Sequence, residues 1–562
     1  MLFLLLCSIC FSVLPSAGSG PPGSPQISIV RQLYDQGNWQ EIVRLIPAAS
    51  NGAAELDLYR GLALAKLERW PEARAAFTAG ARKDPSDKRF FLELAGVAFR
   101  TNDLGAAEAN LNRALHLDPR DSYALNFLAT IYFLRGNLEA ALEYWNRISQ
   151  PRINEVKMPP RPRVREELLD KAVVFSPLST LRLKDFETTQ ARLDNLGVFS
   201  FYKWDLQPKN QDSYDIAFHS AERSGWGGNK WLAALSTLRG LPYETVYPAY
   251  YDWGHAAVNV SSLLRWDSQK RRAFASVSTP LERDTRWRLQ VHLDARDENW
   301  DVSDTFRGSA LPLSNMKLRK IEAGAEIRSV ENGRWSWETG VSFARRTFGN
   351  VAAVDPSAEK FFTNGDSLES TVASNYRVIF LPAKRITVDS SVSAALGRFF
   401  AAPLGVNGRT EGALDFHWFP RAEGDDYEME SRLRAGGGFG GVPFDEFFTL
   451  GVERDDNDLW MRGISATHGG RKGNSPLGRD YILWNWSVDK VVYNGTFVKL
   501  KVGPLFDAGR ISDPSGFFGS RGWLYDPGAE LRVRILDTVE VVLSYGRDIR
   551  SGQNVFFGAA LP

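Results

Sequence analysis

The feature that most constrains the fold is an alternation of apolar and polar side chains, which recurs in segments of about ten residues along the C-terminal part of the chain. One such segment places Val539, Val541, Leu543 and Tyr545 on a single face. Successive side chains of a strand point to opposite faces, so each segment predicts a strand with one apolar and one polar face. In a water-soluble sandwich the apolar face packs on a second sheet, whereas in a membrane barrel it faces lipid and the polar face lines a wet lumen.

Composition favours the membrane barrel. The 562 residues include 17 Trp, 17 Tyr, 34 Phe and 48 Gly, which is typical of a barrel with aromatic girdles. A mean hydropathy of −0.28 is compatible with this fold because only alternate residues face lipid. We predict sixteen antiparallel transmembrane strands within residues 227–562, an even number that suits a closed single-chain barrel. The expected strands begin near residues 245, 256, 271, 285, 318, 334, 368, 385, 409, 427, 445, 479, 496, 527, 538 and 554, with extracellular loops near 300–317, 349–367 and 456–478.

The first residues form a short apolar stretch that ends in Pro15-Ser16-Ala17. This stretch is too short to span a bilayer, so we predict a cleaved signal peptide over residues 1–17 rather than a membrane helix or a lipoprotein anchor. The two cysteines, Cys7 and Cys10, both lie within it. Cleavage leaves a mature chain without disulfides or thiol chemistry.

Residues 26–154 repeat with a period of 34 residues. Asp84-Pro85 recurs as Asp118-Pro119, and Ala73 recurs as Ala107 and Ala141. Small residues where two helices cross, and a proline that closes each unit, are the tetratricopeptide signature and favour a solenoid over a generic α-bundle. We expect three full units at about 53–86, 87–120 and 121–154, preceded by a degenerate helix pair at about 26–48.

Stacked helix pairs form a concave face that suits a peptide or a partner protein. The same side chains can instead be merely solvated, so each is a weak candidate. The candidate partner-binding residues are Tyr59, Lys66, Phe91, Arg100, Asn126 and Arg135.

A proline-rich linker at 151–162 leads to a small α/β domain at 165–225. We expect a strand at 172–175, a helix from about 183 to 196 that Gly197 ends, and two further strands. The segment 193–199 and the strand after it resemble the end of a POTRA domain. Such domains lie in the periplasm before the barrels of the outer-membrane assembly family. The resemblance implies capture of substrate strands by pairing at an exposed sheet edge.

The Gly-rich loop between the eleventh and twelfth predicted strands contains Met461-Arg462-Gly463-Ile464. This motif resembles the Arg-Gly motif on the sixth extracellular loop of the BamA-type outer-membrane assembly family, and 506–509 resembles the family's strand-thirteen motif. The resemblance implies that Arg462 and Gly463 fold back into the lumen, where Asp507 holds the guanidinium. The family's strand-twelve acidic residue corresponds to Ser487 or to Asp489 here. A buried guanidinium needs an acceptor on physical grounds also, because an unpaired buried charge is costly.

We find no motif for an enzyme, a metal or a cofactor. The six His residues show no metal-ligand spacing, and the Gly-rich run at 436–441 is not followed by Lys-Ser or Lys-Thr. There is no Gly-x-Ser-x-Gly elbow. A net charge of +1 implies no polyelectrolyte partner, so nucleic acid is not expected.

The sequence therefore predicts a multidomain chain: a tetratricopeptide solenoid, a small α/β POTRA-like domain and a sixteen-stranded transmembrane β-barrel. The resemblance implies a bacterial outer-membrane protein with periplasmic N-terminal domains, which inserts or translocates polypeptides. Its partners are outer-membrane lipid and a polypeptide substrate or a periplasmic protein held by the repeats. The alternatives are a barrel-anchored periplasmic scaffold and a passive channel.

Overall fold

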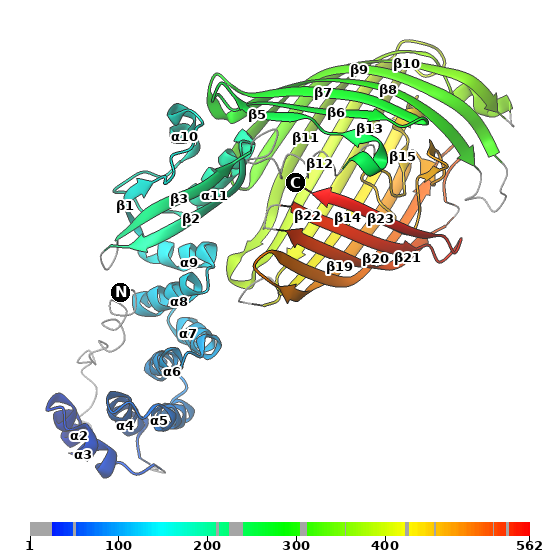
Figure 1. Ribbon diagram of the computed structural model, residues 1–562. Coiled ribbons are helices and arrows are strands. Elements are labelled where there is room, and N and C mark those ends of the chain that lie inside the picture. The colour runs from blue at the N-terminus through cyan, green and yellow to red at the C-terminus, as the bar shows by residue number, and fades with distance from the viewer. Residues whose placement is uncertain are drawn as a thin grey trace. The chain divides into compact units, whose positions relative to one another are not determined.

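The structure is a computed structural model that describes residues 25–48, 52–209, 213–223, 240–303, 312–353, 356–421, 426–454, 457–520, 522–535 and 539–561. The predicted signal peptide lies outside these ranges. The chain divides into two compact units, 1–150 and 151–562, and each is described by itself. Figure 1 labels their helices and strands.

The first unit consists of antiparallel helix pairs. Its helices are α2 (Pro25–Asp35), α3 (Trp39–Leu45), α4 (Ala54–Lys66), α5 (Trp70–Lys83), α6 (Lys88–Arg100), α7 (Leu104–Leu117), α8 (Ser122–Leu134) and α9 (Leu138–Trp145). Asp87, Asp103 and Asp121 cap α6, α7 and α8 by accepting a hydrogen bond from a first-turn backbone N–H. A Cβ on Gly61 would overlap the Phe77 ring, so α4 and α5 cross closely only because Gly61 is small. The helix pairs lie where the 34-residue period predicts them.

The second unit begins with a three-stranded sheet and two helices. The elements are β1 (Arg152–Lys157), α10 (Glu166–Ala172), α11 (Leu183–Leu196), β2 (Phe199–Pro208) and β3 (Ser213–Glu222), and the sheet order is β1-β3-β2. Strand β1 pairs parallel with β3, and β2 pairs antiparallel with it. The sheet thus starts in the segment that its prolines suggested was a linker, and Ala172 ends helix α10 instead of starting a strand.

The rest of the second unit is a closed barrel in which consecutive wall strands pair antiparallel. Its long strands are β5 (Ala249–Trp253), β6 (Val258–Trp266), β7 (Lys270–Leu281), β8 (Asp284–Ser303), β9 (Pro312–Asn332), β10 (Trp335–Ala353), β11 (Gly365–Leu381), β12 (Ile386–Phe399), β13 (Val406–Trp418), β14 (Tyr427–Gly440), β19 (Asp480–Asn494), β20 (Val498–Ser512), β21 (Leu524–Ile535), β22 (Val539–Arg547) and β23 (Asn554–Leu561). The short β4 (Thr245–Val246) pairs with β6, as β5 does, so β4 and β5 form one interrupted strand.

The strand predicted near residue 445 is absent. Residues Phe444–Glu446 form a 3-10 turn (η6), and β14 pairs directly with β19. The short β15 (Phe448–Thr449) pairs only with β18 (Leu477–Gly478), outside the barrel wall. The apolar residues here alternate with charged ones as in a strand, but their side chains fill the barrel interior instead. The described residues therefore contribute fifteen wall strands where sixteen were predicted.

The two faces of the barrel differ as the alternation predicts. Large apolar side chains that are half or more exposed lie on the outer face, namely Val291, Leu293, Ile321, Val341, Val372, Val392 and Leu396. The inner face carries ion pairs such as Arg272–Asp294 (Nη2–Oδ2, 2.8 Å). The predicted fold class, a helical solenoid followed by a small α/β domain and an antiparallel barrel, is confirmed. Among the described residues, no helix combines the length and the apolar character needed to cross a bilayer.

We call the barrel end with the short turns, such as 282–283 and 333–334, the turn end, and the opposite end the loop end. Helix α11 lies at the turn end, where Gly333 N donates to Thr188 Oγ1 (3.2 Å). Arg288 donates to the backbone oxygens of Asn195 and Leu196 at 2.9 Å each. These polar contacts join the small α/β domain to the barrel wall.

Candidate functional site

The segment between β14 and β19, residues 441–479, folds into the lumen and is called the lumen loop below. Its apolar side chains are buried in two clusters. Phe444 and Phe447 pack with Trp300 and Phe348 from the wall near the loop end. Met461 and Ile464 pack with Leu483 and other residues of β19–β21. An apolar connection of this kind would be unfavourable in water, so burial inside the barrel fixes its position.

Arg462 and Asp507 lie in direct contact on the wall of strands β20 and β21. Arg462 Nη2 is 2.6 Å from Asp507 Oδ1, and Nε is 3.0 Å from Oδ2, a two-pronged guanidinium–carboxylate pair. The backbone N of Arg462 also donates to Asp507 Oδ2 (2.7 Å). The Asp507 side chain is 0% exposed and that of Arg462 only 11%. The structure thus brings together the two residues that the motif resemblance paired.

Further groups, which sequence reasoning did not single out, complete the surroundings of this pair. Asn485 Nδ2 donates to Asp507 Oδ1 (2.7 Å), and Arg462 Nη2 donates to the backbone oxygen of Trp486 (3.1 Å). Glu530 Oε2 lies 3.4 Å from Arg462 Nη1. Of the two candidates for the strand-twelve acid, Asp489 pairs with Arg532 and does not reach Arg462. These neighbours depend on strand register, which alternation alone does not fix.

Gly463 is the point of closest approach between the lumen loop and the wall. Its backbone N donates to Asp526 Oδ2 (2.7 Å). A Cβ at this position would lie 2.5 Å from the carbonyl carbon of Arg547 and 2.7 Å from Cγ of Asp526. The site therefore requires glycine because of space, since any side chain would push the loop off the wall.

Other ion pairs hold the lumen loop along its length. Near its start, Arg346 of β10 pairs with Asp445 (Nε–Oδ1, 2.8 Å) and with Glu446. Near its end, Lys472 lies 3.4 Å from Glu298 Oε2 of β8. In between, the guanidinium of Arg454 contacts the backbone oxygen of Gly558 on β23 and lies 3.6 Å from the centre of the Tyr243 ring. The loop thus contacts strands around most of the barrel.

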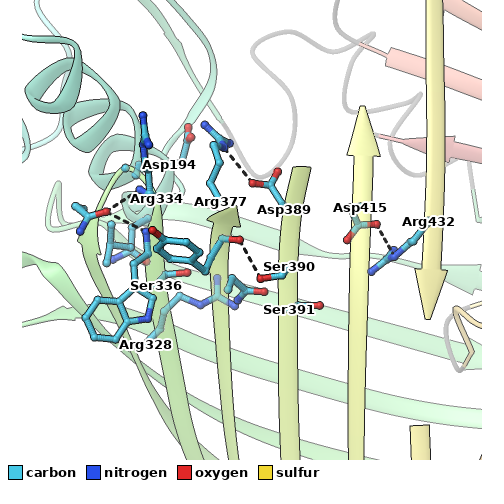
Figure 2. A pocket seen from close by; sticks show the side chains of 18 residues that line it. Asp194, Arg328, Arg334, Ser336, Arg377, Asp389, Ser390, Ser391, Asp415 and Arg432 are labelled. Atoms are coloured by element: carbon cyan, nitrogen blue, oxygen red, sulfur yellow. Dashed lines mark hydrogen bonds and ion pairs between the residues drawn. The ribbon is translucent and has the colours of Figure 1, made fainter. Parts of the chain in front are cut away.

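At the turn end, a polar pocket of about 470 Å³ lies between helix α11 and strands β9–β14. Figure 2 shows the Arg377–Asp389 and Arg432–Asp415 pairs along its wall, with Asp194 of α11 at the rim. The charged atoms of these pairs are 3.0 and 2.8 Å apart. The pocket can therefore hold water or a polar chain segment, with charges already fixed by cross-strand pairing.

The candidate partner-binding residues of the solenoid fall into two groups. Tyr59, Asn126 and Arg135 are engaged within the unit: Tyr59 accepts from Arg31 Nε (3.1 Å), Asn126 accepts from Trp145 Nε1 (2.9 Å), and Arg135 pairs with Glu108. Lys66 is exposed, and Phe91 and Arg100 are half-buried. Their partner-binding role stays a prediction.

Glu93 of α6 was not singled out from the sequence. Burial raises the pKa of its carboxyl from 4.5 to about 7, and Lys66 opposes part of that rise. Because this pKa lies near neutral pH, we expect the stability of this part of the solenoid to depend on pH.

Comparison with known families assigns the first unit. The family model described as "Tetratricopeptide repeat" matches residues 58–109 and 92–152, so the predicted repeats are confirmed. The first unit thus carries tetratricopeptide repeats, and an antiparallel β-barrel follows it in the chain. Comparison with curated proteins found no match.

The solved structures to which the chain is similar include the following three, each at 12% identity. BamA from Haemophilus ducreyi lacking POTRA domains 1–3 has a TM-score of 0.43, with 73% of this chain and 84% of that chain covered. CdiB from Escherichia coli has a TM-score of 0.49, with 74% and 77% covered. CdiB from Acinetobacter baumannii has a TM-score of 0.44, with 84% and 87% covered.

Proposed function

We propose that this chain is an outer-membrane β-barrel that inserts or translocates polypeptides, and that its tetratricopeptide repeats recruit the substrate or a partner from the periplasm. The observation that carries the proposal is the lumen loop, held inside an apolar-faced barrel by the Arg462–Asp507 pair. A loop built only to connect two strands needs neither a buried ion pair nor a glycine pressed against the wall.

The outward apolar residues support placement in a membrane. Half-exposed Val, Leu and Ile side chains on successive strands are costly in water and favourable against lipid. A closed barrel meets the requirement that every backbone group in lipid be hydrogen-bonded. In this proposal the barrel spans the outer membrane and the turn end, with helix α11, faces the periplasm.

The small α/β domain supports a role in substrate capture. Its order of strand, two helices and two strands suits a POTRA-like domain, and β1 and β2 are the two edge strands of its sheet. The start of β1 is covered, because Ile153 exchanges backbone hydrogen bonds with Leu178 and Ser179, so β2 is the more open edge. Edge strands present unpaired backbone groups, to which an extended substrate can add as a further strand. The substrate then meets the polar pocket at the turn end and passes through or beside the barrel as the first and last strands separate.

Folding of the substrate supplies the driving force in this scheme, because strand pairing and lipid contact stabilise the inserted product. No nucleotide-binding or catalytic motif occurs in the sequence, so we propose no enzymatic step.

Reconstitution into liposomes tests the proposal. Liposomes that contain the full chain are expected to accelerate the folding of an unfolded barrel substrate, or cells that produce the chain to export a co-expressed passenger. Failure of both would contradict the proposal.

A second candidate function is a periplasmic scaffold that the barrel only anchors, which the size of the repeat unit favours. Deletion of residues 26–150 separates the two functions. Under our proposal the deletion impairs both partner recruitment and transport. If transport survives and only a partner is lost, the repeats are an adaptor.

A passive channel is the third candidate. The ion pairs that hold the lumen loop across the barrel should keep single-channel conductance small. A large, steady conductance in planar bilayers would favour the channel.

A further inference from the structure

A second cluster of polar side chains lies on the lumen face at the turn end, away from Arg462. His417, at the end of β13, lies opposite Glu430 of β14, and Glu428 is two residues before Glu430 on the same face. One ligand-type atom from each of these three residues lies within 4.8 Å of the other two. His417 Nε2 is 2.7 Å from Glu428 Oε1. The β13–β14 hairpin brings these residues together, so their spacing in the sequence matches no metal motif.

The surrounding patch carries more carboxylates than cations. Asp489 lies directly opposite Glu428 on β19, and like charges in that position destabilise a sheet. Two cations of the described part of the barrel contact the patch: Lys501 pairs with Glu428, and Arg532 pairs with Glu430 and Asp489. Among the described residues, the three carboxylates of Glu428, Glu430 and Asp489 therefore pair with two cations, one of which, Arg532, is shared with Glu530.

Asp489 provides a second and independent observation. Its side chain is 2% exposed, and Arg532 Nε lies 2.9 Å from its Oδ2. The other oxygen, Oδ1, is buried and accepts no hydrogen bond from the described residues. A buried carboxylate oxygen without a hydrogen bond costs free energy, and Arg532 contacts only the other oxygen of Asp489. The cluster thus points to a bound cation.

We propose that His417, Glu428 and Glu430 bind a divalent transition-metal ion, with Zn²⁺ the best match. Imidazole nitrogen and carboxylate oxygen are ordinary Zn²⁺ ligands, whereas Mg²⁺ and Ca²⁺ take oxygen ligands. Each carboxylate has an oxygen to offer: Glu428 uses Oε2 for Lys501, and Glu430 uses Oε2 for Arg532, which leaves Oε1 of each to bind the ion. The positive charge of the ion offsets the excess of carboxylates over cations in the patch.

The geometry needs only small side-chain movements. Two ligand atoms of a tetrahedral Zn²⁺ site, each about 2.0–2.1 Å from the ion, are about 3.3 Å apart. The contact between His417 and Glu428 opens by about half an ångström from 2.7 Å, and Glu430 closes in from within 4.8 Å. The bound ion would join the end of β13 to the start of β14 and stiffen this part of the turn end. The inference does not depend on the transport function proposed above.

Zn²⁺ titration of the full chain, folded in detergent and first dialysed against a chelator, tests the site. We expect one equivalent of Zn²⁺ per chain by calorimetry and elemental analysis. His417→Ala should weaken binding at least about tenfold, because it removes the nitrogen ligand. Glu430→Gln should weaken it also.

His292→Ala is the matched control. His292 also faces the lumen and lies 3.4 Å from Glu322 Oε1, but among the described residues it belongs to no three-ligand group. Its substitution should leave Zn²⁺ binding unchanged. Heat-modifiable migration on gels identifies variants that keep the barrel fold.

Co²⁺ gives a readout on the wild-type chain even if His417→Ala fails to fold. Visible d–d absorption of bound Co²⁺, abolished by one equivalent of Zn²⁺, supports the site. The proposal is overturned if the folded chain binds less than one equivalent of Zn²⁺, if Co²⁺ gives no such absorption, or if folded His417→Ala binds Zn²⁺ as tightly as the wild type.

Discussion

At the scale of single residues, the account depends most on the Arg462–Asp507 pair. Arg462→Ala leaves the fully buried Asp507 carboxylate without its cation. Breaking a buried pair on one side costs about 3–5 kcal/mol. We expect the barrel to assemble but to unfold at a lower temperature in heat-modifiability gels, and transport to be lost.

Arg345→Ala is the control for this substitution. Arg345 pairs with Asp366 (Nε–Oδ1, 2.7 Å), but its side chain is 68% exposed, so the loss should be at most about 1 kcal/mol. If the two variants unfold at the same temperature and transport equally well, Arg462 is an ordinary loop residue.

A second residue-scale prediction concerns Gly463. Gly463→Ala places a methyl group against Arg547 and Asp526, so the lumen loop must move away from the wall. We expect faster protease cleavage within the lumen loop of the folded protein. Gly349→Ala on β10, where a Cβ meets nothing within 4 Å, should leave cleavage unchanged. Unaltered cleavage of Gly463→Ala would contradict the close packing.

The residue-scale contacts were only partly predictable from the sequence. A guanidinium in a lumen requires a carboxylate, and Asp507 lies on a strand that follows the loop. The sequence therefore predicts this pair. Glu530, Asp526 and Asn485 were not predictable, because their approach to the loop depends on strand register across the barrel. The His417 cluster was missed for the same reason.

At the scale of elements, helix α6 should make the repeat unit sensitive to pH through Glu93. Its carboxyl is protonated in both folded and unfolded states below about pH 4.5, so burying it costs no ionisation free energy there. As pH rises toward 7 the unfolded state ionises first, and stability falls. Glu93→Gln should therefore stabilise the unit at pH 8 by about 1–3 kcal/mol and leave it unchanged at pH 4.

Thermal unfolding of residues 26–150, followed by circular dichroism at both pH values, checks this prediction. The unit has a hydrophobic core of its own, so we expect the isolated fragment to fold. Glu72→Gln is the control, because a hydrogen bond from exposed Arg69 lowers the pKa of Glu72 and its removal gives no gain at pH 8. If Glu93→Gln changes the unfolding temperature equally at both pH values, the raised pKa of Glu93 is contradicted.

Most elements followed from sequence patterns, and two exceptions have clear physical causes. The 34-residue period gave the helix pairs, and the helix expected at 183–196 is α11. Apolar residues near 445 were assigned to a strand because periodicity does not distinguish a lipid-facing side chain from one packed inside a barrel. Strand β1 was assigned to a linker because prolines flank it, although a parallel partner, β3, lies some 60 residues later in the chain.

At the scale of the whole molecule, the polar contacts between helix α11 and the barrel should make the small α/β domain and the wall act together. Arg288→Ala removes donors to the backbone oxygens of Asn195 and Leu196, which end α11. We expect increased hydrogen exchange of α11 backbone amides in the folded protein. Arg328→Ala, whose exposed guanidinium pairs within the wall with Glu338, is the control and should leave exchange unchanged. Equal exchange in the two variants would contradict direct coupling.

The most direct test of the central claim is the rate at which an unfolded outer-membrane barrel becomes protease-resistant in liposomes. Three preparations are compared: empty liposomes, liposomes with the full chain, and liposomes with an equal amount of folded Arg462→Ala. The account predicts faster insertion with the full chain than with either of the others. Equal rates in empty liposomes and in those with the full chain would contradict it.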